Sequence, residues 1–202
     1  MKLKYGLQWL YTKWGIPYQL LQINSDPALT SEDYIGLSHY LLSNANLNTY
    51  TICGEKDIDD FKKYIVINAA LNEMQQNNAI NDERIVVYYQ PIINQDGRCV
   101  KAEALLRLNI DGTMYYPGDF LPVVENENYS HFITKAVLNK VCGHIKLLES
   151  QGYEFEKISI NLSTEDLLIN DGYKDLIDIV ENKHKMTFQK IAFEILENTD
   201  KV

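Results

Sequence analysis

Two neighbouring stretches decide the fold of this chain: Tyr88-Tyr89-Gln90-Pro91-Ile92 and Glu103-Ala104-Leu105-Leu106-Arg107-Leu108. Residues 84–89 are rich in β-branched and aromatic residues, which predicts a strand leading into the first stretch. Between the stretches lies Asp96-Gly97, a dipeptide that is typical of a hairpin turn when its flanks are apolar. The second stretch places the carboxylate of Glu103 among apolar residues, where burial is costly unless the charge is paired or bound to a cation.

The second stretch also fits a simpler interpretation. Residues 102–108 have the composition of an amphipathic helix, in which Glu103 and Arg107 would form a solvent-exposed pair one turn apart. These seven residues alone do not distinguish a helix from a strand. From Arg84 onward, however, the apolar pattern alternates between strand and helix periods, which favours an α/β architecture and therefore a strand at 102–108.

The composition excludes several classes of protein. The chain has 202 residues, of which 46% are hydrophobic and 23% charged, enough for one medium domain or a small domain with part of another. A net charge of −9 without a basic stripe argues against general binding of nucleic acid. We find neither the apolar core of a signal peptide nor an apolar run near the ~20 residues of a membrane span. Three scattered cysteines indicate reduced thiols in the cytoplasm and exclude a clustered zinc site.

Apolar spacing and capping signals predict the remaining elements. Before the decisive stretches we expect helices over 1–15, from Thr30 to about 43 and over 57–76, and strands over 16–23 and 48–53. After them we expect a short helix following 117–122, a helix over 131–149, strands over 157–163 and 190–196, and a helix after Gly172. In that last helix the residues expected to face inward are Tyr173, Leu176, Ile177 and Val180.

Three predicted strands carry an oxygen-bearing side chain near the end of the strand: Glu103, Asn161 and Glu194. In the last two strands the residue two positions earlier is small, Ser159 and Ala192 respectively. Small residues below a functional one suit the interior of an α/β barrel, whose chemistry lies at the carboxyl ends of the strands. Two carboxylates and one amide oxygen form a ligand set suited to Mg²⁺ or Mn²⁺.

Such an ion serves the hydrolysis of phosphate esters, because it activates water and neutralises developing charge. Arg107 lies four residues after Glu103 and therefore on the same face of a strand. Its guanidinium group is suited to hold a phosphate through paired hydrogen bonds.

Five motifs then resemble those of a known family, in the same order. They are Tyr89-Gln90-Pro91-Ile92, the stretch from Glu103 to Arg107, the stretch from Pro117 to Pro122, Asn161-Leu162-Ser163, and the stretch from Glu194 to Glu197. They look like the motifs of EAL domains, which are bacterial cyclic-di-GMP phosphodiesterases with a TIM-like barrel. The resemblance implies an α/β fold with an incomplete (β/α) barrel, preceded by a small α/β segment.

The resemblance also implies roles for six residues. Glu103, Asn161 and Glu194 would bind Mg²⁺ or Mn²⁺, with Glu103 counted as catalytic, Gln90 and Arg107 would contact cyclic-di-GMP, and Glu197 would brace a neighbouring loop. Leu196 departs from the pattern, since a threonine is usual between the last two acids. That departure affects the loop-bracing role and none of the ligands.

The motifs correspond only to the front half of an EAL domain. The family's paired aspartates, catalytic lysine and later glutamate and glutamine have no counterpart here. We therefore expect a truncated cyclic-di-GMP phosphodiesterase, of the kind that yields linear pGpG, and little or no activity from the chain alone. The alternative is a non-catalytic module that binds cyclic-di-GMP or a protein partner. An open strand edge near Leu196 predicts self-association.

The front of the chain resembles another signalling domain. Residues 16–53 and the helix after them look like the carboxyl-terminal end of a GGDEF, or diguanylate cyclase-like, domain without its glycine-rich signature. We thus predict a partial degenerate GGDEF-like segment at 1–56, a connecting helix at 57–82 and the first half of an EAL domain at 83–202. The other interpretation of the front segment is an unrelated small α/β cap.

Overall fold

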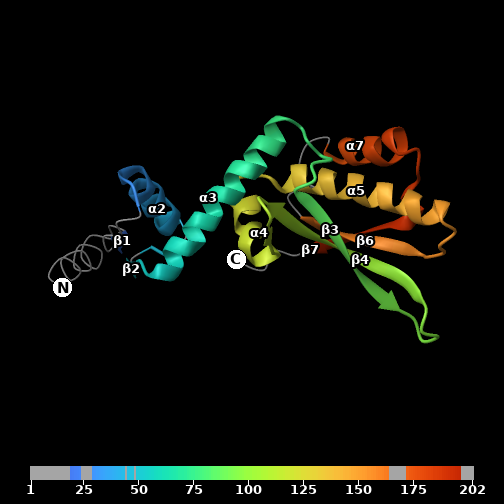
Figure 1. Cartoon of the computed structure of the whole chain (residues 1–202), viewed down its shortest axis with the longest axis horizontal. Coiled ribbons are helices and arrows are strands. Elements are labelled where there is room, and N and C mark those ends of the chain that lie inside the picture. Colours follow the sequence, from blue (N-terminus) through green and yellow to red (C-terminus); the bar gives the residue numbers. More distant parts are fainter. Residues whose placement is uncertain (1–18, 24–28, 44, 48, 164–171, 197–202) are drawn as a thin grey trace. The chain divides into compact units, whose positions relative to one another are not determined.

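The computed structural model describes residues 19–23, 29–43, 45–47, 49–163 and 172–196 (Figure 1). The chain forms two compact units, residues 1–65 and 66–202. The division falls within the long helix α3, which runs from Glu55 to Gln76.

The first unit contains two parallel strands joined by a helix. Strand β1 (Gln19–Gln22) pairs with β2 (Thr49–Ile52), and α2 (Ser31–Ser43) connects them. Helix α2 begins with a capping box, because the backbone nitrogen of Asp33 donates to Thr30 Oγ1 at 3.2 Å and that of Thr30 donates to Asp33 Oδ2 at 2.7 Å. Leu37, Leu41, Cys53 and Phe61 form the core of this unit.

The second unit is built on a sheet of five strands: β3 (Ile85–Ile93), β4 (Cys99–Ile110), β5 (Thr113–Tyr115), β6 (Lys157–Ser163) and β7 (Ile191–Leu196). The main path runs β3-β4-β6-β7, and β5 pairs with β4. Strand β3 is antiparallel to β4, whereas β6 and β7 are parallel to it. The hairpin turns use left-handed backbone at Gly97 (φ 76°) and Gly112 (φ 80°), which a glycine adopts without steric cost.

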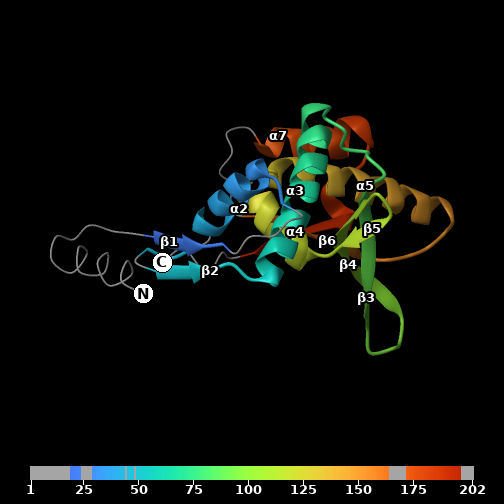
Figure 2. The ribbon, with the colours of Figure 1, turned by 60° about the vertical axis from the view of Figure 1, so that its left-hand side comes forward.

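Helices cover one face of this sheet. Helix α5 (Ser130–Ser150) packs against β3, β4 and β6, and α7 (Gly172–Ile177) lies beside α5, as Figures 1 and 2 show. Ile133, Val137, Val141 and Ile145 form the buried stripe of α5. Helix α4 (Pro117–Asn126) contacts β4 and α5. A π-helical segment (Asp178–Lys183) and a short 3-10 helix (Phe188–Lys190) complete the unit.

The predicted fold class is confirmed, and residues 102–108 lie in strand β4 rather than in a helix. Strand β5 was not expected. The inward positions expected after Gly172 are right for Leu176 and Val180 but wrong for Tyr173 and Ile177, which are 59% and 37% exposed. The helix expected over 1–15 lies outside the described residues. Among the helices that the structure describes, none is both long and apolar enough to cross a membrane.

Candidate active site

Strands β4, β6 and β7 bring Glu103, Asn161 and Glu194 to the same face of the sheet. Glu103 is in register with Ser159 on β6, and Asn161 is two residues further along the same strand. Asn161 is in turn in register with Glu194 on β7. Side chains in register, or two residues apart, project from the same face of a sheet, so the three side chains share one surface. Ser159 is in register with Ala192, and the pair provides the small residues beside them.

Two of the three side chains touch. Asn161 Nδ2 donates a hydrogen bond of 2.9 Å to Glu103 Oε1. The carboxylate of Glu103 is therefore partly compensated, although it lies half-buried among apolar neighbours. Because the amide nitrogen of Asn161 makes this bond, its oxygen is the atom left to bind a cation.

Gln90 and Arg107 extend this surface toward β3. Gln90 lies directly opposite Glu103 in the antiparallel pair of β3 and β4, and its side chain is exposed. Arg107 is in register with Val86, on the same face of β4 as Glu103. Thus Gln90 lies beside Glu103, whereas Arg107 lies on the same face four residues further along β4. Glu197 lies outside the described residues.

The guanidinium group of Arg107 is enclosed by aromatic rings and backbone. Its Nη1 donates to the carbonyl oxygen of Leu106 at 2.6 Å. Its Cζ lies 5.9 Å from the ring centroid of Tyr88 and 5.2 Å from that of Tyr116, within the range of a cation–π interaction. Its Nε is buried and has no hydrogen-bond partner within the described part of the chain.

The residue types on this face are those that bind a hard divalent cation. Mg²⁺ and Mn²⁺ prefer oxygen ligands, and Mg²⁺ is commonly held by one or two carboxylates with the remaining positions filled by water or substrate. In the described ranges no group of three or more His, Cys, Asp and Glu side chains is placed to hold a metal. The set here consists instead of two carboxylates and the amide of Asn161.

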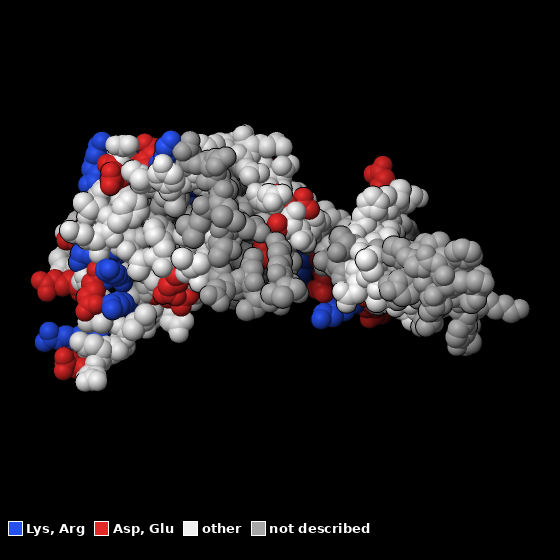
Figure 3. Space-filling model, turned by 180° about the vertical axis from the view of Figure 1, so that it is seen from behind, with Lys and Arg blue, Asp and Glu red and all other residues white. Residues whose placement is uncertain are grey.

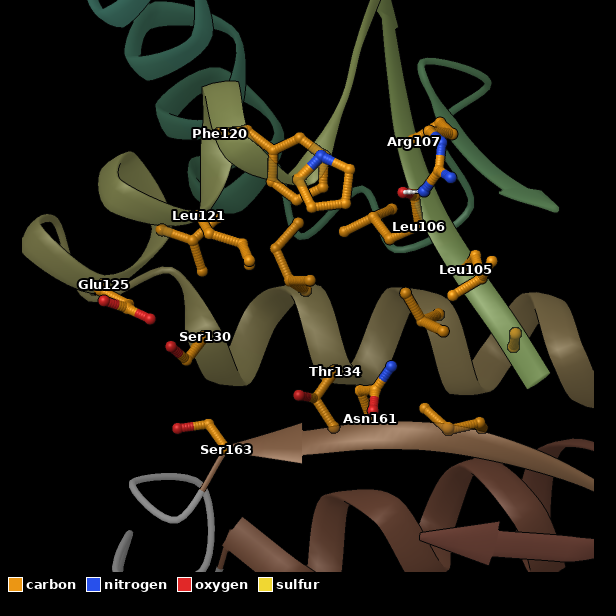
Figure 4. Close-up of a pocket in the computed structure, with 16 residues that line it drawn as sticks. Leu105, Leu106, Arg107, Phe120, Leu121, Glu125, Ser130, Thr134, Asn161 and Ser163 are labelled. Carbon is orange, nitrogen blue, oxygen red and sulfur yellow. Dashed lines mark hydrogen bonds between the residues drawn. The ribbon is translucent and has the colours of Figure 1, made fainter. Parts of the chain in front are cut away.

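A cavity of about 180 Å³ lies between α4, α5 and the strands β4 and β6, on the helix-covered side of the sheet (Figure 4). Phe120 and Leu121 of α4 close it from one side, with Thr134 of α5 and Asn161 of β6 opposite. Arg107 lies at its margin, turned toward the Leu106 carbonyl. The lining is mainly apolar with polar groups at the rim, which is typical of a site for a small organic ligand.

A second polar group lies on the helix-covered face of the sheet. The Tyr89 hydroxyl and His144 Nδ1 are 2.6 Å apart, joining β3 to α5. Burial raises the pKa of Tyr89, and burial followed by the charge of Lys140 lowers the pKa of His144. Both groups are therefore neutral at pH 7, and their contact stabilises the packing of α5 on the sheet.

The sequence prediction missed Tyr88 and Tyr116. Tyr88 precedes Gln90 by two residues, so strand alternation alone places it on the face of Gln90. Tyr116 gave no comparable signal in the sequence, because its position depends on the unexpected strand β5 and on the start of α4. At the start of α4, the backbone nitrogen of Tyr116 donates to Asp119 Oδ2 at 3.1 Å.

Charges of both signs are mixed on the surface. On the face in Figure 3, Lys and Arg side chains are interspersed with Asp and Glu rather than gathered by sign. Such a face offers little attraction to an extended polyanion, and this agrees with the overall charge of −9. A ligand with few phosphates would instead depend on a local group such as Arg107.

Comparison with known families gives a match over more than half of the chain. The sequence model of the family described as "EAL domain" matches residues 73–201. This range includes Gln90, Glu103, Arg107, Asn161 and Glu194. It begins near the end of α3 and so leaves out the whole of the first unit.

Two curated relatives are similar to well over half of the chain. The signaling protein YkoW of Bacillus subtilis is 30% identical over 131 residues, 62% of this chain and 16% of YkoW. The bifunctional diguanylate cyclase/cyclic di-GMP phosphodiesterase MucR of Pseudomonas aeruginosa is 28% identical over 134 residues, 64% of this chain and 19% of MucR. The chain thus spans less than a fifth of the length of either relative.

Solved structures show the same fold. The MucR phosphodiesterase in complex with c-di-GMP superposes with a TM-score of 0.54 at 23% identity, covering 65% of this chain and 54% of that chain. The FimX EAL domain of Xanthomonas citri in complex with c-diGMP gives a TM-score of 0.53 at 15% identity, covering 64% of this chain and 50% of that chain. The matched part, about two thirds of this chain, therefore covers about half of each solved chain.

Proposed function

Because the chain belongs to the EAL domain family, we propose that its second unit supplies part of a metal-dependent site for the hydrolysis of cyclic-di-GMP. The observation that carries this proposal is the arrangement of Glu103, Asn161 and Glu194, which share one face on three adjacent strands, with a 2.9 Å hydrogen bond between the first two. The MucR phosphodiesterase, which has the same fold, was solved in complex with c-di-GMP and supports this ligand class.

In this proposal the oxygens of Glu103, Asn161 and Glu194 bind Mg²⁺ or Mn²⁺, and Glu103 is the catalytic ligand. The bound ion supplies Lewis acidity and lowers the pKa of water. Gln90 and Arg107 bind the dinucleotide, since Gln90 lies opposite Glu103 and Arg107 carries a permanent positive charge suited to a phosphate. Glu197 braces a neighbouring loop.

The hydrolysis of cyclic-di-GMP to linear pGpG is proposed for an EAL domain as a whole. This chain spans 54% of the MucR phosphodiesterase chain and 50% of the FimX domain chain that it matches. What the chain itself provides, in this proposal, is three metal ligands and two ligand-binding side chains. We further propose that it acts in the cytoplasm, which agrees with its free Cys53, Cys99 and Cys142.

Metal binding is the first test. Calorimetry with MnCl₂ or MgCl₂ should detect a site in the wild-type chain and at least a tenfold loss of affinity in Glu103→Gln, since glutamine keeps an acceptor for Asn161 but removes the charge. Glu149→Gln makes the same chemical change at an exposed position of α5 and should bind metal as the wild type does. Equal metal affinity in Glu103→Gln and the wild type would refute the metal site.

The second test adds cyclic-di-GMP. Titration in the presence of Mn²⁺, with chromatographic detection of pGpG, separates binding from turnover. Binding that weakens in Glu103→Gln, with pGpG formed by the wild type, supports the hydrolase. Binding without pGpG supports the non-catalytic module, and the absence of both rejects cyclic-di-GMP as a ligand of this chain.

For the first unit, we propose a degenerate GGDEF-like segment at residues 1–56, with a connecting helix at 57–82 before the EAL half at 83–202. The parallel pair β1–β2 joined by α2 agrees with an α/β segment of this kind. MucR, whose printed description names both a cyclase and a phosphodiesterase, is a relative with both activities. An experimental structure in which β1-α2-β2 fails to superpose on a diguanylate cyclase domain would reject this assignment.

A further inference from the structure

Three side chains from separate segments meet next to the proposed site. Tyr88 comes from β3, Arg107 from β4, and Tyr116 from the residue before α4. The guanidinium carbon lies 5.9 Å from the Tyr88 ring and 5.2 Å from the Tyr116 ring. Tyr88 shares its face of β3 with Gln90, so this cluster continues the surface that carries Gln90 and Glu103.

Both tyrosine rings remain largely open to solvent. Tyr88 is 49% exposed and Tyr116 is 54% exposed, although each contacts the guanidinium of Arg107. Exposed aromatic area beside a cation is costly to hydrate and well suited to a flat ligand. The ring surface that does not contact Arg107 is therefore available for stacking.

Besides its contacts with the two rings, Arg107 makes a hydrogen bond to the backbone. Its Nη1 donates to the Leu106 carbonyl at 2.6 Å, and its Nε is buried without a partner in the described part of the chain. A guanidinium has five N–H donors, so several remain for a ligand after the bond to Leu106. Donors in the plane of the group suit a phosphate, whereas the rings provide apolar faces next to it.

We propose that Tyr88 and Tyr116 form a stacking subsite for the purine base of a nucleotide whose phosphate is bound by Arg107. The inference rests on the proposed function, because it adds the base-binding part of the same ligand site. A base and its own phosphate are separated by one ribose, so a single nucleotide reaches both the rings and the guanidinium. Stacking on aromatic side chains contributes affinity for any base without requiring hydrogen-bond recognition.

The experiment compares ligands with and without a base. GMP and ribose 5-phosphate are titrated by calorimetry into the full chain and into Tyr88→Leu, Tyr116→Leu and the corresponding phenylalanine variants. Each leucine variant should weaken GMP binding by roughly 5- to 150-fold, the range expected for loss of one stacking contact, and leave ribose 5-phosphate unchanged. Each phenylalanine variant keeps the ring and should retain the affinity for GMP.

Tyr153→Leu is the matched control, because Tyr153 is 62% exposed and lies after α5, away from the sheet face that carries Arg107. Circular dichroism of all variants checks that they fold. A second measurement uses the 5′-monophosphate of 2-aminopurine riboside, whose fluorescence is quenched by stacking. Quenching should occur with the wild type and be lost with both leucine variants.

Four results would overturn the subsite. Equal losses for GMP and ribose 5-phosphate would show that the tyrosines only position Arg107. Unchanged GMP binding in both leucine variants, or no GMP binding by the wild type, would exclude base stacking. If both leucine variants hydrolyse cyclic-di-GMP as the wild type does, the subsite is rejected and the proposed function stands. If the chain binds GMP through its base but binds no metal, the proposed function is rejected and the subsite stands.

Discussion

The contact between Tyr89 and His144 shows how a single pair connects the sheet to its covering helix. The hydroxyl of Tyr89 and Nδ1 of His144 lie 2.6 Å apart, and the two rings meet edge to face with centroids 5.6 Å apart. Tyr89 belongs to the motif that precedes the proposed site, but its side chain points to the opposite face from Gln90. Alternate residues of one strand thus face the packed helix and the proposed site.

Removing that hydroxyl tests the packing role. Tyr89→Phe should lower the free energy of unfolding by about 1 kcal/mol, because His144 loses its partner while remaining partly buried. Tyr153→Phe, at a position that is 62% exposed, should change the free energy of unfolding by less than about 0.5 kcal/mol. Urea denaturation of the two variants measures both values, and equal stabilities would contradict the role of the contact.

The lowered pKa values of two histidines predict how the free energy of unfolding depends on pH. Burial, with the charge of Lys140, lowers the pKa of His144, and burial, with Lys183 and Lys146, lowers the pKa of His184. Below about pH 6.5 the unfolded chain binds protons that the folded chain does not, so the free energy of unfolding falls as the pH drops. The carboxyl groups of Asp82 and Asp175, whose pKa values are also lowered, cause losses only below about pH 4.

Urea denaturation between pH 7.5 and 5 isolates the histidine contribution. The wild type should lose stability across this range, and His144→Gln and His184→Gln should each reduce the slope. His39→Gln is the control, because it makes the same substitution at an exposed histidine of α2. A wild-type stability that is constant or rises toward pH 5 would contradict the prediction.

At the scale of elements, α5 is the helix on which the second unit depends. Its buried residues contact three strands, and Ile145 has no exposed surface, whereas Leu147, two residues later, is 54% exposed. The 3.6-residue period of the helix places these two neighbours on different faces, so one helix provides both a test position and its control.

Truncation of the buried residue should be far more costly than truncation of the exposed one. Ile145→Ala should lower the free energy of unfolding by about 2–5 kcal/mol through lost burial and the cavity left behind. Leu147→Ala should change it by no more than about 0.5 kcal/mol. The measurement is urea denaturation followed by circular dichroism, and similar losses for both variants would mean that α5 does not pack as the structure has it.

The elements also show why some features could be predicted and others could not. Strict alternation in β6 and β7 is enough to place Asn161 and Glu194 on one face, since the period of a strand is short and local. The register between β4 and β6, which brings Glu103 to Asn161, depends on contacts between segments more than fifty residues apart. The expectation that Glu103 lies near the end of its strand was wrong, because β4 continues from Glu103 to Ile110.

The errors have local physical causes. Strand β5 has only three residues, Thr113–Tyr115, too few for a periodic pattern, and it forms because Gly112 reverses the chain onto β4. Ile177 was assigned to the buried face by assuming an α-helical period, but a π-helical segment follows at once and changes the rotation per residue. Tyr173, in the first turn of a six-residue helix, keeps its polar tip in solvent.

At the scale of the whole molecule, the β7 edge of the sheet in the second unit is relevant to self-association of the chain. Within the described residues β7 pairs with β6 alone, so its outer backbone groups are free to pair with another strand. Ile195 on this strand is 55% exposed. Ile191, Phe193 and Ile195 form one apolar face of β7, while its one charged residue, Glu194, lies on the opposite face with Asn161. An edge strand with unpaired backbone groups and an apolar face is a template for pairing with a second chain.

We therefore expect the chain to self-associate through β7, and a charge added to the apolar face of that strand should prevent it. Ile195→Lys adds a charge of the kind that natural edge strands use against pairing, so it should shift the protein toward monomer. Ile92→Lys makes the same change at a residue of β3 that is 46% exposed, and it should leave association unchanged. Sedimentation velocity over a hundredfold range of concentration measures the distribution of species. A wild type that stays monomeric throughout, or dimers that persist in Ile195→Lys and dissociate in Ile92→Lys, would exclude β7 as the interface.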